Sequence, residues 1–89
     1  MKIKLELFGA SRDFSNKDHL NLEIQNKASV DDLRNEIIKY LDKNFKGNEN
    51  FIKVVKSSAF CSENNEIISD NYKITKEQKI GIIPPIGGG

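Results

Sequence analysis

The stretch Ser29–Leu41, SVDDLRNEIIKYL, is where the hydrophobic pattern of the chain changes from the period of a strand to that of a helix. Apolar residues recur at spacings of three or four positions: Val30, Leu33, Ile37, Tyr40, Leu41 and Phe45. This spacing places them on one face of an amphipathic helix. Ser29 and Asp32 resemble an N-terminal capping arrangement. The sequence therefore predicts a helix that runs to about Asn44.

Two segments before this helix alternate between apolar and polar residues, which is typical of strands with one buried face. They are Lys2–Phe8 and His19–Gln25, with the inward residues Ile3, Leu5, Leu7, Leu20, Leu22 and Ile24. Residues 10–16 between them are expected to form a loop or a short helical turn. The two strands can pair as a hairpin.

Further strands are expected after the helix. They are predicted within Phe51–Lys56, with an extension around Ala59–Cys61, at Glu66–Ser69, and at Lys79–Ile83. Ile74 is expected to anchor the chain before the last strand. Within that strand, Ile80 and Ile82 face inward, whereas Gly81 and Ile83 lie on the other face.

The order strand, strand, helix, strand, short strand, strand predicts an α+β fold with one main helix across one face of a mixed sheet. A ubiquitin-like β-grasp is the smallest architecture that fits this order within 89 residues. We expect a single β-grasp domain over residues 1–83 and a flexible C-terminal tail over residues 84–89.

Composition excludes several classes of function. The formal net charge is +1 and the lysines are scattered, which argues against a nucleic-acid partner. No apolar run reaches membrane-spanning length and no signal peptide is visible, so neither a membrane partner nor export is expected. Cys61 is the one cysteine and has no internal disulfide partner, which favours a reducing cytoplasm.

Few side chains suggest chemistry within the body of the domain. His19 has no cysteine or acidic partner at metal-ligand spacing and is expected on an exposed strand face. Cys61 is expected to be a small buried hydrophobe, because no electropositive neighbour would lower its pKa. The sequence predicts no metal site and no general base.

The final stretch, Pro84–Gly89 or PPIGGG, offers a different chemistry. The two prolines fix φ and stiffen the exit from the domain, and the glycines after them lack side chains. A terminus this slim can enter a narrow channel and present the carboxylate of Gly89 at its tip. We expect that carboxylate to be activated as an acyl-adenylate and then captured by a nucleophile.

Three segments carry a resemblance to a known family. The first is Leu7–Asp13, LFGASRD, which is like the family's strand that ends in Phe before an Ala and an Arg-acid pair. The second is Ser29–Arg34, SVDDLR, which is like the family's helix-opening T-V-x-x-L-R. The third is Ile80–Gly89, IGIIPPIGGG, which is like the family's ending V-A-x-x-P-P-V-x-G-G. The last is the most specific. The chain resembles the small, sulfur-carrying subunit of molybdopterin synthase, the MoaD-like branch of the ubiquitin-like proteins.

The resemblance implies a mechanism. A ubiquitin-activating-type enzyme uses ATP to adenylate Gly89, and a sulfur donor converts it to a thiocarboxylate. The tail, with Gly88 and Gly89 at its reacting end, then enters the large subunit of molybdopterin synthase. There the sulfur passes to cyclic pyranopterin monophosphate. The chain itself is expected to bind no cofactor.

The resemblance also implies a surface for these partners. Phe8 breaks the polar face of its strand and can join the last strand and the tail in one apolar patch. The residues expected to bind partners are Phe8, Arg12, Ile83, Pro84, Pro85, Ile86 and Gly87. Arg12 is either a solvated loop charge or an ion-pair contact to a partner.

Two segments depart from the family pattern. Lys76–Lys79 replaces an Asp-Gly-Asp type turn, and Ser57–Asn65 fits poorly, as if a residue or two were inserted. Neither touches the tail. Three alternative functions stay open: a sulfur carrier for thiamine thiazole or tRNA thiolation, a ubiquitin-like protein modifier, and a β-grasp interaction module with an inert tail.

Overall fold

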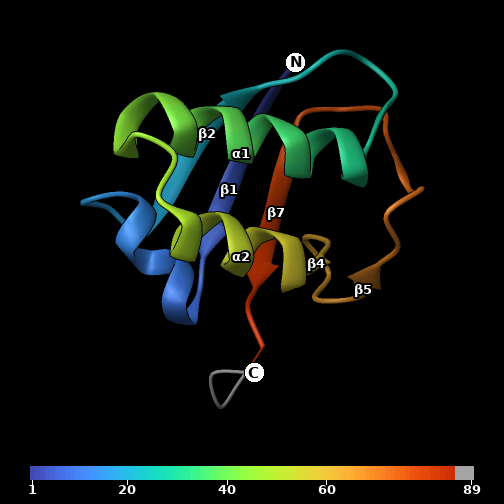
Figure 1. Ribbon diagram of the computed structural model, residues 1–89. Coiled ribbons are helices and arrows are strands. Elements are labelled where there is room, and N and C mark those ends of the chain that lie inside the picture. Colours follow the sequence, from blue (N-terminus) through green and yellow to red (C-terminus); the bar gives the residue numbers. More distant parts are fainter. Residues whose placement is uncertain (86–89) are drawn as a thin grey trace.

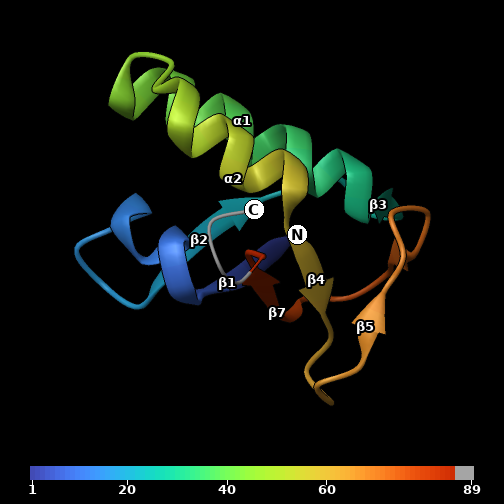
Figure 2. The same ribbon diagram turned by 60° about the horizontal axis from the view of Figure 1, so that its bottom comes forward.

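A computed structural model of the chain describes residues 1–85. Five strands form a sheet in the order β2-β1-β7-β4-β5, and two helices cover one of its faces (Figure 1). The elements are β1 Lys2–Leu7, the 3-10 helix η1 Gly9–Phe14, β2 His19–Glu23, β3 Ala28–Ser29, α1 Val30–Phe45, α2 Glu49–Ser57, β4 Ala59–Cys61, β5 Ile67–Ile68, β6 Lys73–Ile74 and β7 Gln78–Ile83. Seen from the second direction, both helices lie on the same side of the strands (Figure 2).

The sheet is mixed, as the sequence predicts. β1 pairs antiparallel with β2 and parallel with β7, and β4 pairs antiparallel with both β7 and β5. Leu5 is paired with Leu20 on one side and with Ile80 on the other, so one apolar row crosses the three strands. Strand pairing therefore brings the predicted inward residues to the face that the helices cover.

The core lies between this sheet face and α1. The apolar stripe of the helix is fully buried, with Val30, Leu33, Ile37 and Leu41 each 0 % exposed. Of the predicted inward strand residues, only Leu22, on the edge strand β2, is partly exposed. Phe14 of η1 adds a fully buried ring that the strand and helix patterns did not include.

The strand predicted within Phe51–Lys56 is wrong. These residues belong to α2, whose first turn is capped by the Asn48 side chain: it accepts hydrogen bonds from the backbone N–H groups of Asn50 and Phe51. Val55 is buried and Phe51 is half-buried on the side that packs toward α1 and η1. The β-branched residues of this segment favour a strand, but capping and packing against α1 determine a helix.

The predicted extension at Ala59–Cys61 is a strand, β4, and it follows directly after α2. Ser57–Asn65, which fits the family pattern poorly, thus contains the end of α2, β4 and a turn in which Asn65 has a φ of 62°. The turn before β7 needs no left-handed residue, because none of residues 75–78 has a positive φ. Lysine and glutamate can therefore occupy it without strain.

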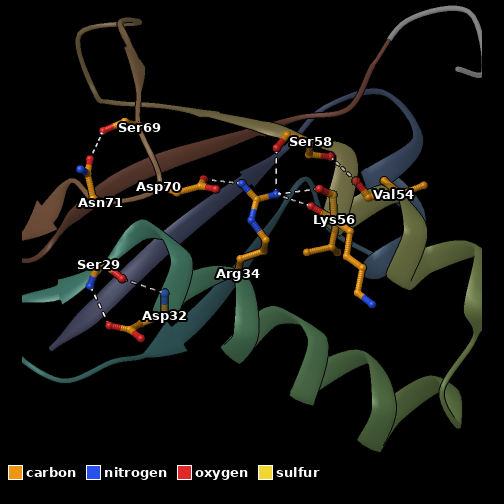
Figure 3. Close-up of polar contacts among 10 residues, drawn as sticks. Ser29, Asp32, Arg34, Val54, Lys56, Ser58, Ser69, Asp70 and Asn71 are labelled. Atoms are coloured by element: carbon orange, nitrogen blue, oxygen red, sulfur yellow. Dashed lines mark hydrogen bonds and ion pairs between the residues drawn. The ribbon is translucent and has the colours of Figure 1, made fainter.

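Arg34 of α1 joins three parts of the chain (Figure 3). Its Nη1 donates to the carbonyl oxygens of Val55 at 2.6 Å and Ser58 at 2.9 Å, at the C-terminal end of α2. Its Nη2 lies 2.6 Å from Oδ1 of Asp70, and its guanidinium lies 4.9 Å from the centre of the Phe60 ring. The side chain is only 11 % exposed. Arg34 thus gives a side-chain donor to carbonyl groups at the end of α2, where the Val55 oxygen also accepts a 3.3 Å bond from the Ser58 N–H.

The cap at the start of α1 is reciprocal, as Ser29 and Asp32 predict. The Asp32 backbone N–H donates to Oγ of Ser29 at 3.1 Å, and the Ser29 N–H donates to Oδ2 of Asp32 at 2.9 Å. The bond from the Ser29 backbone, followed by its hydroxyl, lowers the pKa of Asp32 below its ordinary value of 3.8.

This cap predicts a pH effect on stability. Because the folded pKa of Asp32 lies below that of the unfolded chain, its ionised carboxylate stabilises the fold above about pH 4. The contribution is lost as the pH falls through the folded pKa. We expect the difference in melting temperature between the wild type and Asp32→Asn to shrink as the pH is lowered from about 5 toward 2. A difference that stays constant over this range contradicts the assignment.

Candidate functional site

The root of the C-terminal tail is held by the domain. After the half-buried Ile83 of β7, Pro84 is buried and Pro85 is exposed. A Cβ placed on Gly9 would lie 3.9 Å from both Cδ and Cγ of Pro84, so the proline ring packs beside this glycine. Gly9 has a φ of 55°, a conformation that glycine adopts without strain. The described chain is therefore anchored as far as Pro84, and the first exposed residue of the tail is Pro85.

The segment beside Pro84 is itself anchored to both helices. The Ser11 N–H and hydroxyl both donate to the carbonyl oxygen of Phe8, which starts the turn of η1. At the other end of η1, the Tyr40 hydroxyl donates to the carbonyl oxygen of Phe14 at 2.9 Å, and the Phe14 ring lies 5.2 Å from that of Phe51. The end of β7 and η1 lie together at the bottom of Figure 1. The root of the tail therefore lies on a segment, η1, that packs against β7 and both helices.

The sheet face opposite the helices carries an apolar patch close to this root. Cys61 is paired with Gly81 on one side and with Ile67 on the other, and Ile83 is paired with Ala59. Residues directly opposite on neighbouring strands share a face, and the adjacent Ile80 and Ile82 are buried on the helix side. We define the apolar patch as Phe8, Ala59, Cys61, Ile67 and Ile83. Phe8 is 45 % exposed and Ile67 is 66 % exposed.

The other half of this face is polar. Nζ of Lys79 lies 3.4 Å from Oε1 of Glu6, and His19 is paired with Glu6 on β2. Nδ1 of His19 lies 2.9 Å from Oδ1 of Asp18, and this hydrogen bond lowers the pKa of Asp18 below its ordinary value. The face is thus apolar near the tail and charged on the side of β2.

Residues 1–85 contain no group of three or more His, Cys, Asp or Glu side chains that could hold a metal ion. Within the same residues, no helix is long and apolar enough to cross a membrane. A groove of about 910 Å³ lies between residues 23–28 and α1. It is distant from the end of β7, which lies on the opposite side of Figure 1.

The structure brings together part of the predicted surface. Phe8 and Ile83 lie on the outward sheet face, as their strand positions predict, and Arg12 is exposed on η1. Pro84, which was expected to contact partners, is buried against the domain. Ile86, Gly87, Gly88 and Gly89 lie outside the described residues.

Sequence reasoning missed three residues of the patch, Ala59, Cys61 and Ile67, and Ile67 is the largest exposed side chain among them. Ile67 stands in a polar stretch, and its place on the outward face depends on pairing with Cys61 through the two-residue strand β5. Ile67 and Ile68 are adjacent apolar residues and show no alternation. Their pattern could therefore indicate a short strand but not which of the two side chains faces outward.

The ThiS family model matches residues 5–89. Among solved structures, a Pyrococcus furiosus protein provisionally named molybdopterin converting factor, subunit 1, is 24 % identical with a TM-score of 0.69, over 96 % of this chain and 98 % of that one. SAMP1 from Haloferax volcanii is 14 % identical with a TM-score of 0.68, over all of both chains. The Caldiarchaeum subterraneum ubiquitin is 18 % identical with a TM-score of 0.62, over 100 % of this chain and 98 % of that one. No curated protein sequence matches the chain significantly.

These likenesses confirm the predicted ubiquitin-like α+β fold. The class is that of small ubiquitin-like α+β proteins. Within this class, the chain belongs to the ThiS family, which covers all but its first four residues. ThiS-family and MoaD-like sulfur carriers in general work with a partner subunit and an adenylating enzyme.

Proposed function

We propose that the chain is the sulfur-carrying small subunit of molybdopterin synthase. In this role the Gly89 carboxylate is adenylated, converted to a thiocarboxylate, and used to donate sulfur to cyclic pyranopterin monophosphate. The observation that supports it best is the apolar patch beside an anchored tail root, because a carrier must dock its body while its terminus enters the partner. Membership of the ThiS family and the Pro-Pro pair before the glycines agree with this role.

The chemistry requires activation from outside the chain. A carboxylate is a poor electrophile until one of its oxygens becomes part of a good leaving group. When that oxygen joins the α-phosphate of ATP, pyrophosphate leaves and an acyl-adenylate forms. A donor then supplies sulfur at the oxidation level of sulfide, which attacks the acyl carbon and displaces AMP, and the resulting thiocarboxylate is a good sulfur nucleophile. The carrier supplies the carboxylate and its position, and the activating enzyme supplies the catalysis.

The anchored root limits how far the carboxylate can reach. Five residues follow Pro84, and an extended chain spans at most about 3.6 Å per residue, or about 18 Å in total. In each complex, the reacting centre of the activating enzyme or of the large subunit must therefore lie within about this distance of Pro84. The apolar patch lies beside the root of the tail. Docking of a partner on this patch would therefore determine how deep the tail enters that partner.

A ubiquitin-like protein modifier is the second candidate. It is favoured by the structural likeness to SAMP1 and to the Caldiarchaeum subterraneum ubiquitin. In that role the same acyl-adenylate is captured by a target lysine and an isopeptide bond forms. A sulfur carrier for thiamine thiazole or tRNA thiolation differs only in the acceptor, and the family match fits that alternative as well.

The deciding experiment is the intact mass of the chain after incubation with ATP, its cognate activating enzyme and a sulfur donor. A carrier gains the mass of one oxygen-to-sulfur exchange at Gly89, and the gain requires ATP. Adding the large subunit and cyclic pyranopterin monophosphate should reverse the exchange and yield molybdopterin. No exchange under these conditions counts against any carrier role, whereas exchange without molybdopterin formation favours another acceptor. Higher-mass conjugates in cell extracts would favour the modifier.

Phe8→Lys and Ile83→Lys test the apolar patch. We expect each to weaken binding to the large subunit by at least about tenfold, since the lysine is solvated in the free chain but desolvated in the complex. Tyr72→Lys is the matched control, because Tyr72 is 39 % exposed and lies outside the patch. Calorimetric titration gives the affinities, and melting temperatures confirm folding. Equal affinity of either patch variant and the wild type would exclude that residue from the interface.

A further inference from the structure

Gly81 lies in the middle of the tail-bearing strand β7, where a glycine weakens a strand unless close packing requires it. Its backbone does not need glycine, because its φ is not positive. The side chains around Gly81, however, leave no free space for a Cβ atom. A Cβ on Gly81 would lie 2.9 Å from Cε2 of Phe8 and 2.8 Å from Sγ of Cys61. Any side chain at position 81 would therefore have to displace the Phe8 ring and the Cys61 thiol.

The contact holds the Phe8 ring in place. Phe8 directly follows β1, and its carbonyl oxygen accepts two hydrogen bonds from Ser11, which fix its backbone. Its ring rests on the bare Cα of Gly81, which fixes the side chain even though Phe8 remains 45 % exposed. An exposed phenylalanine on an open strand would otherwise sample several rotamers.

The strand that supports the ring is also the strand that carries the tail. Ile83 and Pro84 follow Gly81 by two and three residues, so the ring and the tail root share one rigid element. Aromatic side chains dominate binding at interfaces, and ordering them before binding removes an entropic cost. We propose that Gly81 is a positioning residue: it holds the Phe8 ring against β7, so that Phe8 and the tail root form one docking site before the large subunit binds. This inference rests on the proposed function for the identity of the partner.

The orientation of the ring can be tested in the free protein. We expect nuclear Overhauser contacts between the α-protons of Gly81 and the ring protons of Phe8, with one dominant χ1 rotamer for Phe8. In Gly81→Ala the added methyl group occupies the space of the ring edge, so the rotamer distribution should broaden or shift. Missing ring contacts in the wild type would overturn the inference without any reference to a partner.

The effect on binding is tested by a double-mutant cycle against the large subunit of molybdopterin synthase. We expect Phe8→Ala to weaken binding by about tenfold or more, and Gly81→Ala by about fivefold. In the Phe8→Ala background, Gly81→Ala should cost less than about twofold more, because its effect passes through the ring. Melting temperatures of all variants separate this effect from a loss of folding.

A second background isolates the ring from the thiol. In Cys61→Ala the sulfur beside Gly81 is absent, so Gly81→Ala retains only its conflict with Phe8 and should still weaken binding. This pair also provides a folded variant if Gly81→Ala alone is unstable. The inference would be overturned if Gly81→Ala lowered the affinity for the large subunit equally in the wild-type and Phe8→Ala backgrounds. It would also be overturned if Gly81→Ala lowered that affinity in neither the wild-type nor the Cys61→Ala background. A wild-type chain that does not bind the large subunit would instead contradict the proposed function, and the ring contacts in the free protein would still decide the role of Gly81.

Discussion

Deletion of Gly89 is expected to abolish sulfur transfer and to leave the melting temperature almost unchanged. The buried hydrophobic core of the described residues runs from Ile3 to Ile82, so the deletion removes none of it. Gly88 would then carry the terminal carboxylate, about 3.5 Å short of the reacting centre. A displacement of 1 Å can already cost on the order of a hundredfold in rate. The readout is thiocarboxylate formation and complementation of a strain deficient in molybdenum cofactor.

Two further variants distinguish the length of the C-terminal tail from its width. Addition of one residue after Gly89 moves the carboxylate in the opposite direction and should also abolish transfer. Gly88→Val keeps the length, but its β-branched side chain restricts φ and ψ and widens a segment that must pass through a channel. Lys76→Ala, in the exposed turn before β7, is the control that should retain full activity. Full complementation by the Gly89 deletion would end the carrier hypothesis.

Arg34→Ala is expected to lower the free energy of unfolding by roughly 2–4 kcal/mol, a large part of the stability of a small domain. The substitution removes the guanidinium donor from the carbonyl groups of Val55 and Ser58, of which the Val55 oxygen keeps a 3.3 Å bond from the Ser58 N–H, and it removes the cation from the Phe60 ring. Because these carbonyls end α2, we expect α2 and β4 to exchange their amide protons fastest in the variant. Chemical denaturation gives the free energy, and hydrogen exchange locates the loss.

Two controls divide the role of this side chain. Arg34→Lys keeps the charge but not the planar fork that reaches three carbonyls and a carboxylate, so it should recover only part of the loss. Asp70→Asn removes the charge of a carboxylate that is 61 % exposed and should cost less than about 1 kcal/mol. If Asp70→Asn were as damaging as Arg34→Ala, the ion pair rather than the carbonyl contacts would account for the effect.

The long periodic elements could be predicted from the sequence because their patterns repeat several times. β1 and β2 alternate over five or six residues, and α1 repeats its apolar spacing over four turns. α2 could not be separated from a strand in this way. It has nine residues, and Ile52, Val54 and Val55 favour a strand by propensity, while its helical state depends on packing against α1.

The surface followed from the sequence only in part. The outward register of Phe8 and Ile83 is a local property of alternating strands, so it could be predicted. The burial of Pro84 depends on the approach of Gly9 from a distant turn, and the role of Gly81 depends on the ring and the thiol above it. Contacts of this kind join residues far apart in the chain, and no local pattern records them.

The parallel pairing of β1 with β7 makes the folding of this domain strongly non-local. Leu5 and Ile80 are neighbours at the centre of the sheet although nearly the whole chain separates them. Such contacts slow folding, because a long loop must close before they form. The strand that carries the tail is also the last to be synthesised, so the sheet cannot close while β7 is still in the ribosome. A nascent or truncated chain that lacks either strand has no anchored Pro84, so the proposed docking site exists only in the completed fold.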